Sequence, residues 1–197
     1  MSDLRRELRR KAFHMLSLVY LAAYLIVGYP RILAPLAIWL AIVSAGEAAR
    51  LLSSRLGRIL TALFGDLIRD SEKRSVSGLF FTTVGVFAAM LIAVRHPRVV
   101  AAVLAWQAFG DSAAALVGKA WGRHRILGGA KSWEGSSACF LSCLVIGLAL
   151  GLGPKAAAGG ALAAAFVEFL PTTWFCNDNL LMPAVAAAVV LVLGGAG

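Results

Sequence analysis

Residues 99–119 read VVAAVLAWQAFGDSAAALVGK, and this stretch decides the fold. Before Lys119 it contains a single charged residue, Asp111. A helix rises about 1.5 Å per residue, so about 20 apolar residues cross the hydrocarbon core of a bilayer. A carboxylate inside such a helix costs about 2.5–3.5 kcal/mol at mid-membrane, so it needs a partner or a polar cavity. The stretch predicts a membrane-spanning helix in which Asp111 has a function.

The composition of the whole chain agrees with this interpretation. The 197 residues are 60% hydrophobic and 15% charged, with a mean hydropathy of +0.81, whereas about a quarter of an ordinary soluble domain is charged. We therefore expect residues 1–197 to form a single transmembrane domain whose chemistry lies in short loops and helix ends. The net charge of +9 comes from small basic groups without a continuous stripe or an aromatic platform, so nucleic acid is not an expected partner.

Further apolar stretches before and after this one predict the rest of the architecture. In all there are seven candidate spans, at residues 12–28, 32–52, 78–94, 99–119, 133–152, 155–170 and 180–196. Between the second and the third, apolar residues recur at helical spacing, at Leu52, Leu56, Ile59, Leu60, Leu63 and Leu67. That segment predicts an amphipathic helix on the membrane surface. The expected fold is an all-α polytopic integral membrane protein.

The distribution of charge predicts the orientation. With the N-terminus inside and seven spans, four of the 19 Lys and Arg residues fall on outer turns, at Arg31, Arg95, Arg98 and Lys155. The other basic residues then lie inside, as the positive-inside rule requires. No acidic residue falls on an outer turn. We expect an N-in, C-out topology in a cytoplasmic membrane, or an endomembrane in a eukaryote.

Two polar groups near the inner face are individually weak signals. Glu7, Arg10, Lys11 and His14 share one stripe of the first helix. Basic residues there are often only topology anchors, but a histidine inside the bilayer boundary needs a partner or a task. The second group is residues 72–78 (EKRSVSG), which is also typical of a solvated loop before a helix. Its candidate residues are Glu72, Arg74 and Gly78.

The third group is the strongest. Asp111, Ala115, Gly118 and Gly122 lie at intervals of three and four residues, so a groove of small residues leads from the carboxylate to a basic loop. Helix packing alone also uses such grooves, but packing does not require an aspartate. The loop and the start of the next span add the candidate residues Arg123, Arg125, Lys131, Ser132, Glu134 and Gly135.

The fourth group comprises Glu168 together with Asp178 and Asn179. Asn and Asp before a helix with an early proline are ordinary capping residues. Glu47, inside the second span, is a further intramembrane carboxylate and therefore a candidate. The cysteines have no histidine beside them and are expected to be small apolar residues without a role.

The predicted topology brings these groups together. Spans one, three, five and seven all begin at the inner face, so their unpaired N–H groups point toward the same side. Helix N-termini bind anions, and Asp111, Glu134, Glu168 and Asp178 supply the hard oxygens that Mg²⁺ prefers. With the basic residues, this predicts a site for a nucleoside triphosphate and Mg²⁺.

Four segments carry a specific resemblance to a known family. They are residues 7–14 (ELRRKAFH), 72–78, 110–122 with 131–136 (KSWEGS), and 178–180 (DNL). In this order they resemble the membrane-embedded CTP-dependent lipid-alcohol kinases, namely dolichol kinase, phytol kinase and the yeast-type CTP-dependent diacylglycerol kinase, within the wider membrane cytidylyltransferase superfamily. The likeness covers nearly the whole chain and is most specific in residues 110–136.

The resemblance implies that CTP donates a phosphoryl group to the hydroxyl of a lipid alcohol, such as a polyprenol, dolichol or phytol, at the cytoplasmic face. In-line transfer depends mainly on positioning and charge neutralisation. The implied roles are Mg²⁺ binding by Asp111 and Asp178, and orientation of Lys131 or binding of a second metal by Glu134. The alcohol proton would go to His14 or Asp111. The implied phosphate and nucleotide contacts are Arg10, Lys11, Gly118, Gly122, Arg123, Arg125, Lys131, Ser132 and Gly135.

Two alternatives remain at this point. A cytidylyltransferase that forms a CDP-lipid from a phospholipid is disfavoured, because the long signature of CDP-diacylglycerol synthases is not present. A small transporter is disfavoured because the polar groups gather at one face, whereas transporter sites lie near the midplane.

Overall fold

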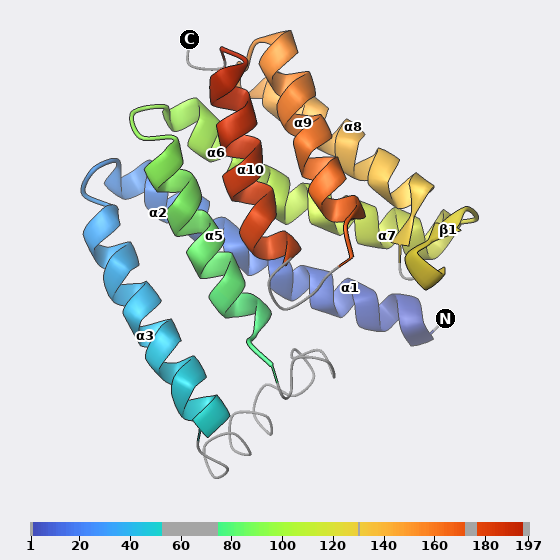
Figure 1. Cartoon of the computed structure of the whole chain (residues 1–197), viewed down its shortest axis with the longest axis horizontal. Helices are drawn as coiled ribbons and strands as arrows, with labels where there is room; N and C mark the ends of the chain where they lie inside the picture. The colour runs from blue at the N-terminus through green and yellow to red at the C-terminus, as the bar shows by residue number, and fades with distance from the viewer. Residues whose placement is uncertain (1, 53–74, 130, 172–176, 195–197) are drawn as a thin grey trace.

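The computed structural model describes residues 2–52, 75–129, 131–171 and 177–194. In these ranges the chain is helical apart from one short hairpin (Figure 1). Most of the predicted surface helix between the second and third spans lies outside the described residues, so it stays a prediction. The helices that the apolar stretches predict are all found close to the expected positions.

The first half of the chain forms long helices joined by short turns. Helix α1 (Ser2–His14) continues through the 3-10 turn η1 (Met15–Ser17) into α2 (Leu18–Val27). Helix α3 (Leu33–Leu52) follows a turn that contains Gly28 at φ 72°. After the gap in the description, α5 (Gly78–Ile92) leads to α6 (Pro97–Ala105).

The second half of the chain contains residues 110–136, the segment in which the sequence resemblance is most specific. Helix α6 passes through a π-helical turn, η3 (Trp106–Gly110), into α7 (Asp111–Trp121). A hairpin of β1 (Arg125–Ile126) and β2 (Lys131–Ser132), joined through η4 (Leu127–Gly129), precedes α8 (Trp133–Ala149). Helices α9 (Pro154–Phe169) and α10 (Asp178–Val192) complete the described chain.

Capping side chains set the starts of three helices. Ser77, Ser132 and Asn177 precede α5, α8 and α10, and the side chain of each accepts a hydrogen bond from a backbone N–H in the first turn. Each cap satisfies one of the N–H groups that a helix start leaves without a partner. Prolines begin α6 and α9 at Pro97 and Pro154, where a missing N–H costs nothing.

Helix α10 packs against α5 and α9, and α8 packs against α9 and α7. The small residues of α9 allow this close approach. A Cβ added at Gly160 would lie 2.6 Å from the buried ring of Trp106 and 2.4 Å from Val190, and Ala157 and Ala161 are fully buried. These small residues therefore serve close helix packing.

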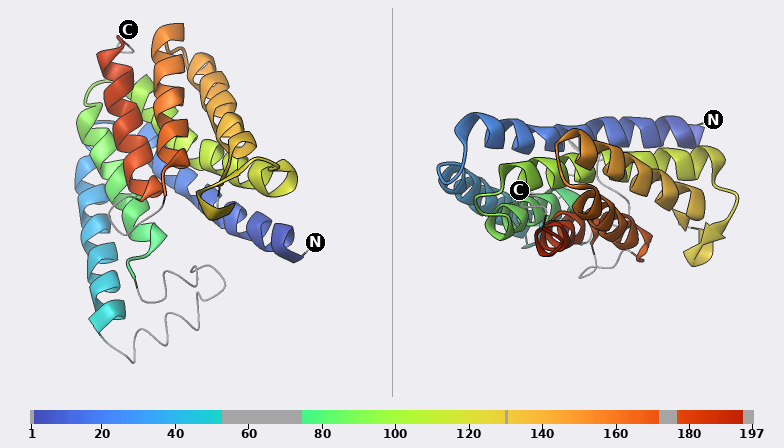
Figure 2. Two further views of the ribbon diagram at one scale, coloured as in Figure 1. Left: turned by 45° about the vertical axis from the view of Figure 1, so that its right-hand side comes forward. Right: turned by 90° about the horizontal axis from the view of Figure 1, so that it is seen from above.

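Helices α1 and α2 run beside the helix formed by α6, η3 and α7 (Figure 2). Helix α1 contacts α7, whereas α2 contacts α6, so the two long helices are antiparallel. This pairing places the polar stripe of α1 alongside the start of α7, where Asp111 lies.

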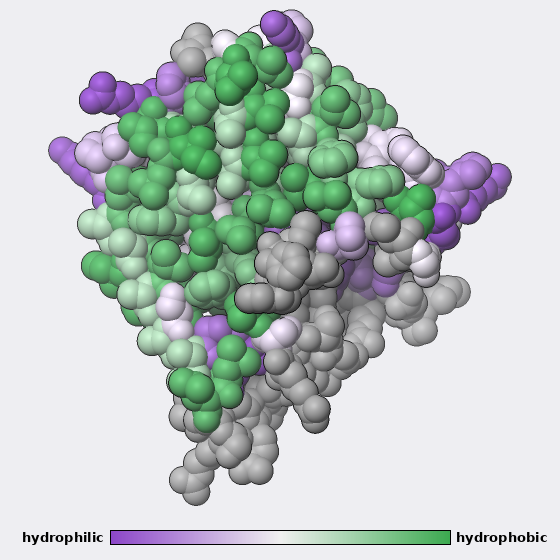
Figure 3. All heavy atoms as spheres, in the orientation of Figure 1, coloured by the Kyte–Doolittle hydropathy of each residue, from purple (hydrophilic) through white to green (hydrophobic). Residues whose placement is uncertain are grey.

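Three helices of the described residues are long and apolar enough to cross a membrane: Arg10–Val27, Leu33–Leu52 and Pro97–Trp121. Shorter apolar helices cover Gly78–Ile92, Trp133–Ala149 and Asp178–Val192. Apolar side chains cover the broad face over α5, α10 and α9, and polar ones gather toward its edges (Figure 3). Large side chains such as Ile26 and Leu162 are exposed on the helices, as expected where lipid replaces water as the surrounding medium.

Candidate active site

Three carboxylates meet where α7, α9 and α10 approach one another. Asp111 begins α7, Glu168 lies in the last turn of α9, and Asp178 begins α10. One oxygen of each lies within 4.8 Å of the others, and the residues are only 7%, 6% and 8% exposed. We call this group the carboxylate cluster. Like charges at this separation repel strongly in a desolvated site, so the cluster needs cations.

Two lysines supply positive charge to the cluster. Lys11 Nζ lies 2.5 Å from Asp111 Oδ2. Lys131 Nζ lies 3.0 Å from Glu168 Oε1 and 3.6 Å from Asp178 Oδ2, and it also donates to the backbone carbonyl of Glu168. The cluster is therefore held by ammonium groups that come from α1 and from the hairpin.

One carboxylate oxygen of the cluster lacks a hydrogen-bond partner among the described residues. Glu168 Oε2 is buried and has no hydrogen-bond partner within the described part of the chain. A buried carboxylate oxygen without a partner is costly. An oxygen of this kind, next to two further carboxylates, fits a divalent cation such as Mg²⁺, which prefers oxygen ligands.

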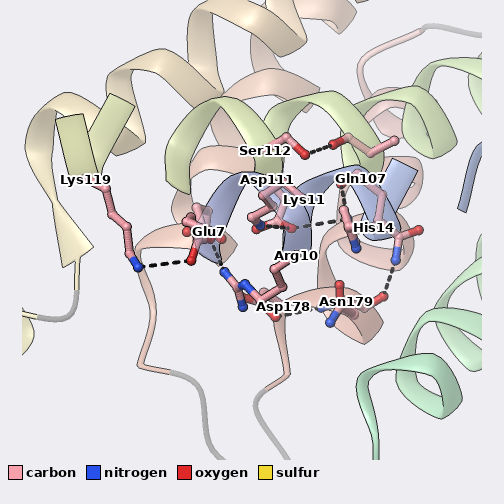
Figure 4. A network of polar contacts seen from close by, with 12 residues as sticks. Glu7, Arg10, Lys11, His14, Gln107, Asp111, Ser112, Lys119, Asp178 and Asn179 are labelled. Carbon is pink, nitrogen blue, oxygen red and sulfur yellow. Dashed lines mark hydrogen bonds and ion pairs between the residues drawn. The ribbon is translucent and has the colours of Figure 1, made fainter. Parts of the chain in front are cut away.

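The contacts of His14 determine which ring nitrogen carries its proton. Nε2 lies 3.0 Å from the carbonyl oxygen of Gln107 and 3.1 Å from Asp111 Oδ2 (Figure 4). A backbone carbonyl can only accept a hydrogen bond, so Nε2 carries the hydrogen. In the neutral imidazole the lone pair is then on Nδ1, and any proton that His14 accepts goes to Nδ1.

Glu7 joins α1 to α7 beside the cluster (Figure 4). It pairs with Arg10 on its own helix, and its Oε2 lies 3.1 Å from Lys119 Nζ on α7. Burial alone would raise the pKa of Glu7, but the hydrogen bonds and charges of Arg10 and Lys119 outweigh burial and lower the pKa below its usual value. The ion pairs of Glu7 therefore fix the α1 stripe next to Asp111.

The hairpin presents exposed basic side chains. Arg123, His124 and Arg125 are exposed, and the strands pair Arg125 with Ser132. Glu134 accepts hydrogen bonds from the backbone N–H of His124 and contacts His124 Nδ1 at 2.7 Å. Glu134 therefore ties His124 to the start of α8, whereas Lys131 contacts Glu168 instead; binding of a second metal by Glu134 stays a prediction.

The predicted groove of small residues is filled by the start of α8. A Cβ at Gly118 would lie 3.1 Å from Ser132 Oγ, and one at Gly122 would lie 2.7 Å from it. A Cβ at Gly135 would lie 2.7 Å from the carbonyl oxygen of Ala114. In the structure these glycines allow α7 and α8 to pack closely. This contact places the hairpin, and with it Lys131, next to the carboxylate cluster.

The remaining candidates lie elsewhere or cannot be placed. Glu47 pairs with Arg50 and accepts hydrogen bonds from the backbone N–H and hydroxyl of Ser77, so it ties α3 to the start of α5, next to Gly78. Asn179 follows Asp178 at the edge of the cluster. Glu72 and Arg74 lie outside the described residues. Cys139 and Cys143 are free and buried, as expected for apolar residues without a role.

Sequence reasoning missed Gln107. It is 1% exposed, and it contacts both His14 and the first turn of α10. A glutamine in an otherwise apolar span was the available signal, because a buried amide must find partners.

Comparison with known proteins agrees with this chemistry. The CTP-dependent diacylglycerol kinase 1 of Schizosaccharomyces pombe is 25% identical, in an alignment that covers 75% of this chain and 74% of that protein. The phytol kinase of Synechocystis sp. is 40% identical over 73 residues, which cover 36% of this chain and 26% of that protein. No family model and no solved structure matches the chain. The chain is a distant homologue of the CTP-dependent lipid kinases, and the relatives it matches are kinases.

Proposed function

From this distant homology and the site geometry, we propose that the protein is a CTP-dependent kinase that phosphorylates the hydroxyl group of a lipid alcohol. The observation that carries the proposal is the buried carboxylate cluster in direct contact with two lysines. Phosphoryl transfer needs little covalent help from a protein and depends on positioned cations around the transferred group. The cluster and its neighbours supply both a metal site and cationic side chains.

Asp111 and Asp178 would hold Mg²⁺, with Glu168 as a third oxygen donor. The unpartnered Glu168 Oε2 supports this assignment. When bound, Mg²⁺ neutralises phosphate charge. Lys131 and Lys11 already contact these carboxylates, so they lie within reach of phosphates that would join the metal there.

The nucleotide would lie between the hairpin and α1. Its phosphates would meet Lys131, Lys11 and Arg10. Arg123 and Arg125 on the exposed hairpin would contact the outer part of the nucleotide. In this arrangement helix ends and one hairpin supply the nucleotide contacts.

The lipid alcohol would reach this site from the bilayer. Its oxygen attacks the γ-phosphorus of CTP, the bond from that phosphorus to the bridging oxygen breaks, and CDP leaves. The proton of the alcohol goes to His14 Nδ1 or to a carboxylate oxygen of Asp111. His14 suits this role, because its Nε2 is held by the Gln107 carbonyl and its other nitrogen keeps a lone pair.

The proposal includes an integral membrane location with seven spans, the N-terminus inside and the site at the cytoplasmic face. The antiparallel helices and the charge distribution of the loops support this orientation. The lipid is one with a free hydroxyl, and polyprenol, dolichol, phytol and diacylglycerol are the substrates to compare.

CTP labelled either at the γ-phosphate or in the cytosine ring tests the proposal. Purified protein receives each nucleotide with Mg²⁺ and a panel of prenols, phytol, diacylglycerol and phosphatidic acid. A kinase moves the γ-label to a lipid and leaves the cytosine label in CDP. Transfer of the cytosine label to phosphatidic acid would instead establish a cytidylyltransferase, and no transfer of either label would refute both activities.

A further inference from the structure

A proline in α10 leaves one backbone carbonyl without its helical donor. Pro183 lies inside α10, four residues after Asn179. In an α-helix the carbonyl of residue 179 accepts from the N–H of residue 183, and proline has no N–H. The Asn179 carbonyl, next to the cluster residue Asp178, therefore requires a donor from another part of the molecule.

Gln107 is that donor. Its Nε2 donates to the Asn179 carbonyl oxygen at 2.8 Å, and the side chain is buried. Helix α5 approaches the same carbonyl so closely that a Cβ at Gly85 would lie 2.4 Å from the oxygen. Three helices therefore converge on a carbonyl that Pro183 releases and Gln107 satisfies.

The same residue also contacts the other side of the site. The backbone carbonyl of Gln107 accepts from His14 Nε2 at 3.0 Å, and Gln107 lies in the π-helical turn that leads directly into Asp111. Such π-turns are frequent at functional sites. One residue thus connects the imidazole on α1, the first carboxylate of α7 and the start of α10.

The backbone of Asn179 is held on both sides of its Cα. The N–H of Asn179 donates to Asp178 Oδ1 and to Asn177 Oδ1, each at 3.0 Å, while its carbonyl accepts from Gln107. Asp178 Oδ1 and the Gln107 amide therefore hold the two successive peptide groups that flank the Cα of Asn179, so the position of the Asp178 carboxylate is linked to Gln107 through this one residue (Figure 4).

We propose that Gln107 is a positioning residue that sets Asp178 relative to Asp111 and His14, and thereby sets the affinity of the site for its divalent cation. This inference rests on the proposed Mg²⁺-dependent function. Partners that orient metal ligands without touching the metal typically change metal affinity by 10–100-fold when they are removed.

The test is a rescue experiment on Mn²⁺ binding, measured by electron paramagnetic resonance of the purified protein in detergent. Gln107→Leu should weaken Mn²⁺ binding about tenfold, within the range for such partners. Adding Pro183→Ala restores an N–H four residues after Asn179, so the double variant should regain most of the affinity. The Mg²⁺ concentration for half-maximal turnover should shift in parallel.

Tyr20→Phe is the matched control. Tyr20 also forms an interhelical hydrogen bond, to Thr83 Oγ1 at 2.7 Å in a half-buried position, and accepts from Trp39, but it does not belong to the cluster. Its loss should lower thermal stability and leave Mn²⁺ affinity unchanged. If Gln107→Leu does not fold, the folded double variant with near wild-type affinity supports the inference, and a double variant that folds but binds weakly overturns it.

Three outcomes contradict the inference while leaving the kinase proposal in place: wild-type Mn²⁺ affinity in Gln107→Leu, no rescue by Pro183→Ala, or an equal loss in Tyr20→Phe. Failure of the wild-type protein itself to bind Mn²⁺ or to transfer phosphate would instead refute the proposed function. The two failures are therefore separated by the wild-type measurement.

Discussion

Replacing Lys131 with methionine removes the ammonium group that contacts two carboxylates of the cluster. The distances of 3.0 Å to Glu168 and 3.6 Å to Asp178 correspond to a gross attraction of about 5 kcal/mol each at an effective dielectric constant near 20. Desolvation offsets much of this attraction, but removal of one partner from a buried pair typically costs about 3–5 kcal/mol. We expect Lys131→Met to lose about that much stability.

A second substitution separates stability from activity. Glu168→Gln in the Lys131→Met background removes one of the carboxylate charges that the lysine had neutralised, so it should return part of the lost stability. It cannot restore the lost phosphate contact. We expect turnover to stay at least roughly a hundredfold below the wild type, equivalent to about 2.7 kcal/mol of transition-state stabilisation.

The assays are denaturation in detergent and calorimetric titration with CTP in the presence of Mg²⁺. Lys131→Arg keeps the charge in a different shape and should be only partly tolerated. Lys155→Met is the control, because it removes an equal charge from an exposed position at the start of α9. Equal stability and equal CTP affinity in the wild type and Lys131→Met would refute the assignment of Lys131 to both the cluster and the nucleotide.

Two further predictions concern the membrane and pH. In a chain without its native cysteines, a cysteine at position 96 or 154 should react with an impermeant thiol reagent outside intact cells, whereas one at position 126 should not; the reverse pattern would overturn the common inner face. Because ion pairs lower the pKa of Glu7, its contribution to stability is present above the usual carboxyl pKa and is lost as the pH falls below it. Thermal unfolding followed from pH 7 down to about pH 3, a range that extends below the usual carboxyl pKa, should therefore be less pH-dependent in Glu7→Gln, and identical pH dependence in the two proteins would contradict the role of Glu7.

The positions of the helices were predictable because they depend on local information. Apolar stretches of sufficient length, prolines at helix starts and capping residues such as Ser132 and Asn177 all lie within a few residues of the element they define. The sequence also indicated Asp111 and Glu168, because carboxylates are costly in apolar helices, and it indicated Asp178 through the resemblance of residues 178–180 to the lipid-alcohol kinases.

The pairings between these residues were not predictable. Lys131 contacts Glu168, and Glu134 contacts His124, because the packing of the hairpin on α8 and α9 decides which carboxylate each cation reaches. The small-residue stripe was ambiguous for the same reason, since Gly118 serves a helix contact as well as it would serve a ligand. The contact of Gln107 depends on the Asn179 carbonyl, 72 residues further along the chain, which Pro183 leaves without its helical donor.

The most direct test of the account is turnover by Asp111→Asn and Asp178→Asn, measured as transfer of γ-phosphate from CTP to lipid. Each substitution keeps the size of the side chain and removes one negative charge from the proposed Mg²⁺ site. We expect a loss of at least roughly a hundredfold in both variants, about 2.7 kcal/mol, with unfolding temperatures that show the proteins are folded. Near-normal transfer by both folded variants would contradict the claim that the carboxylate cluster is the catalytic metal site.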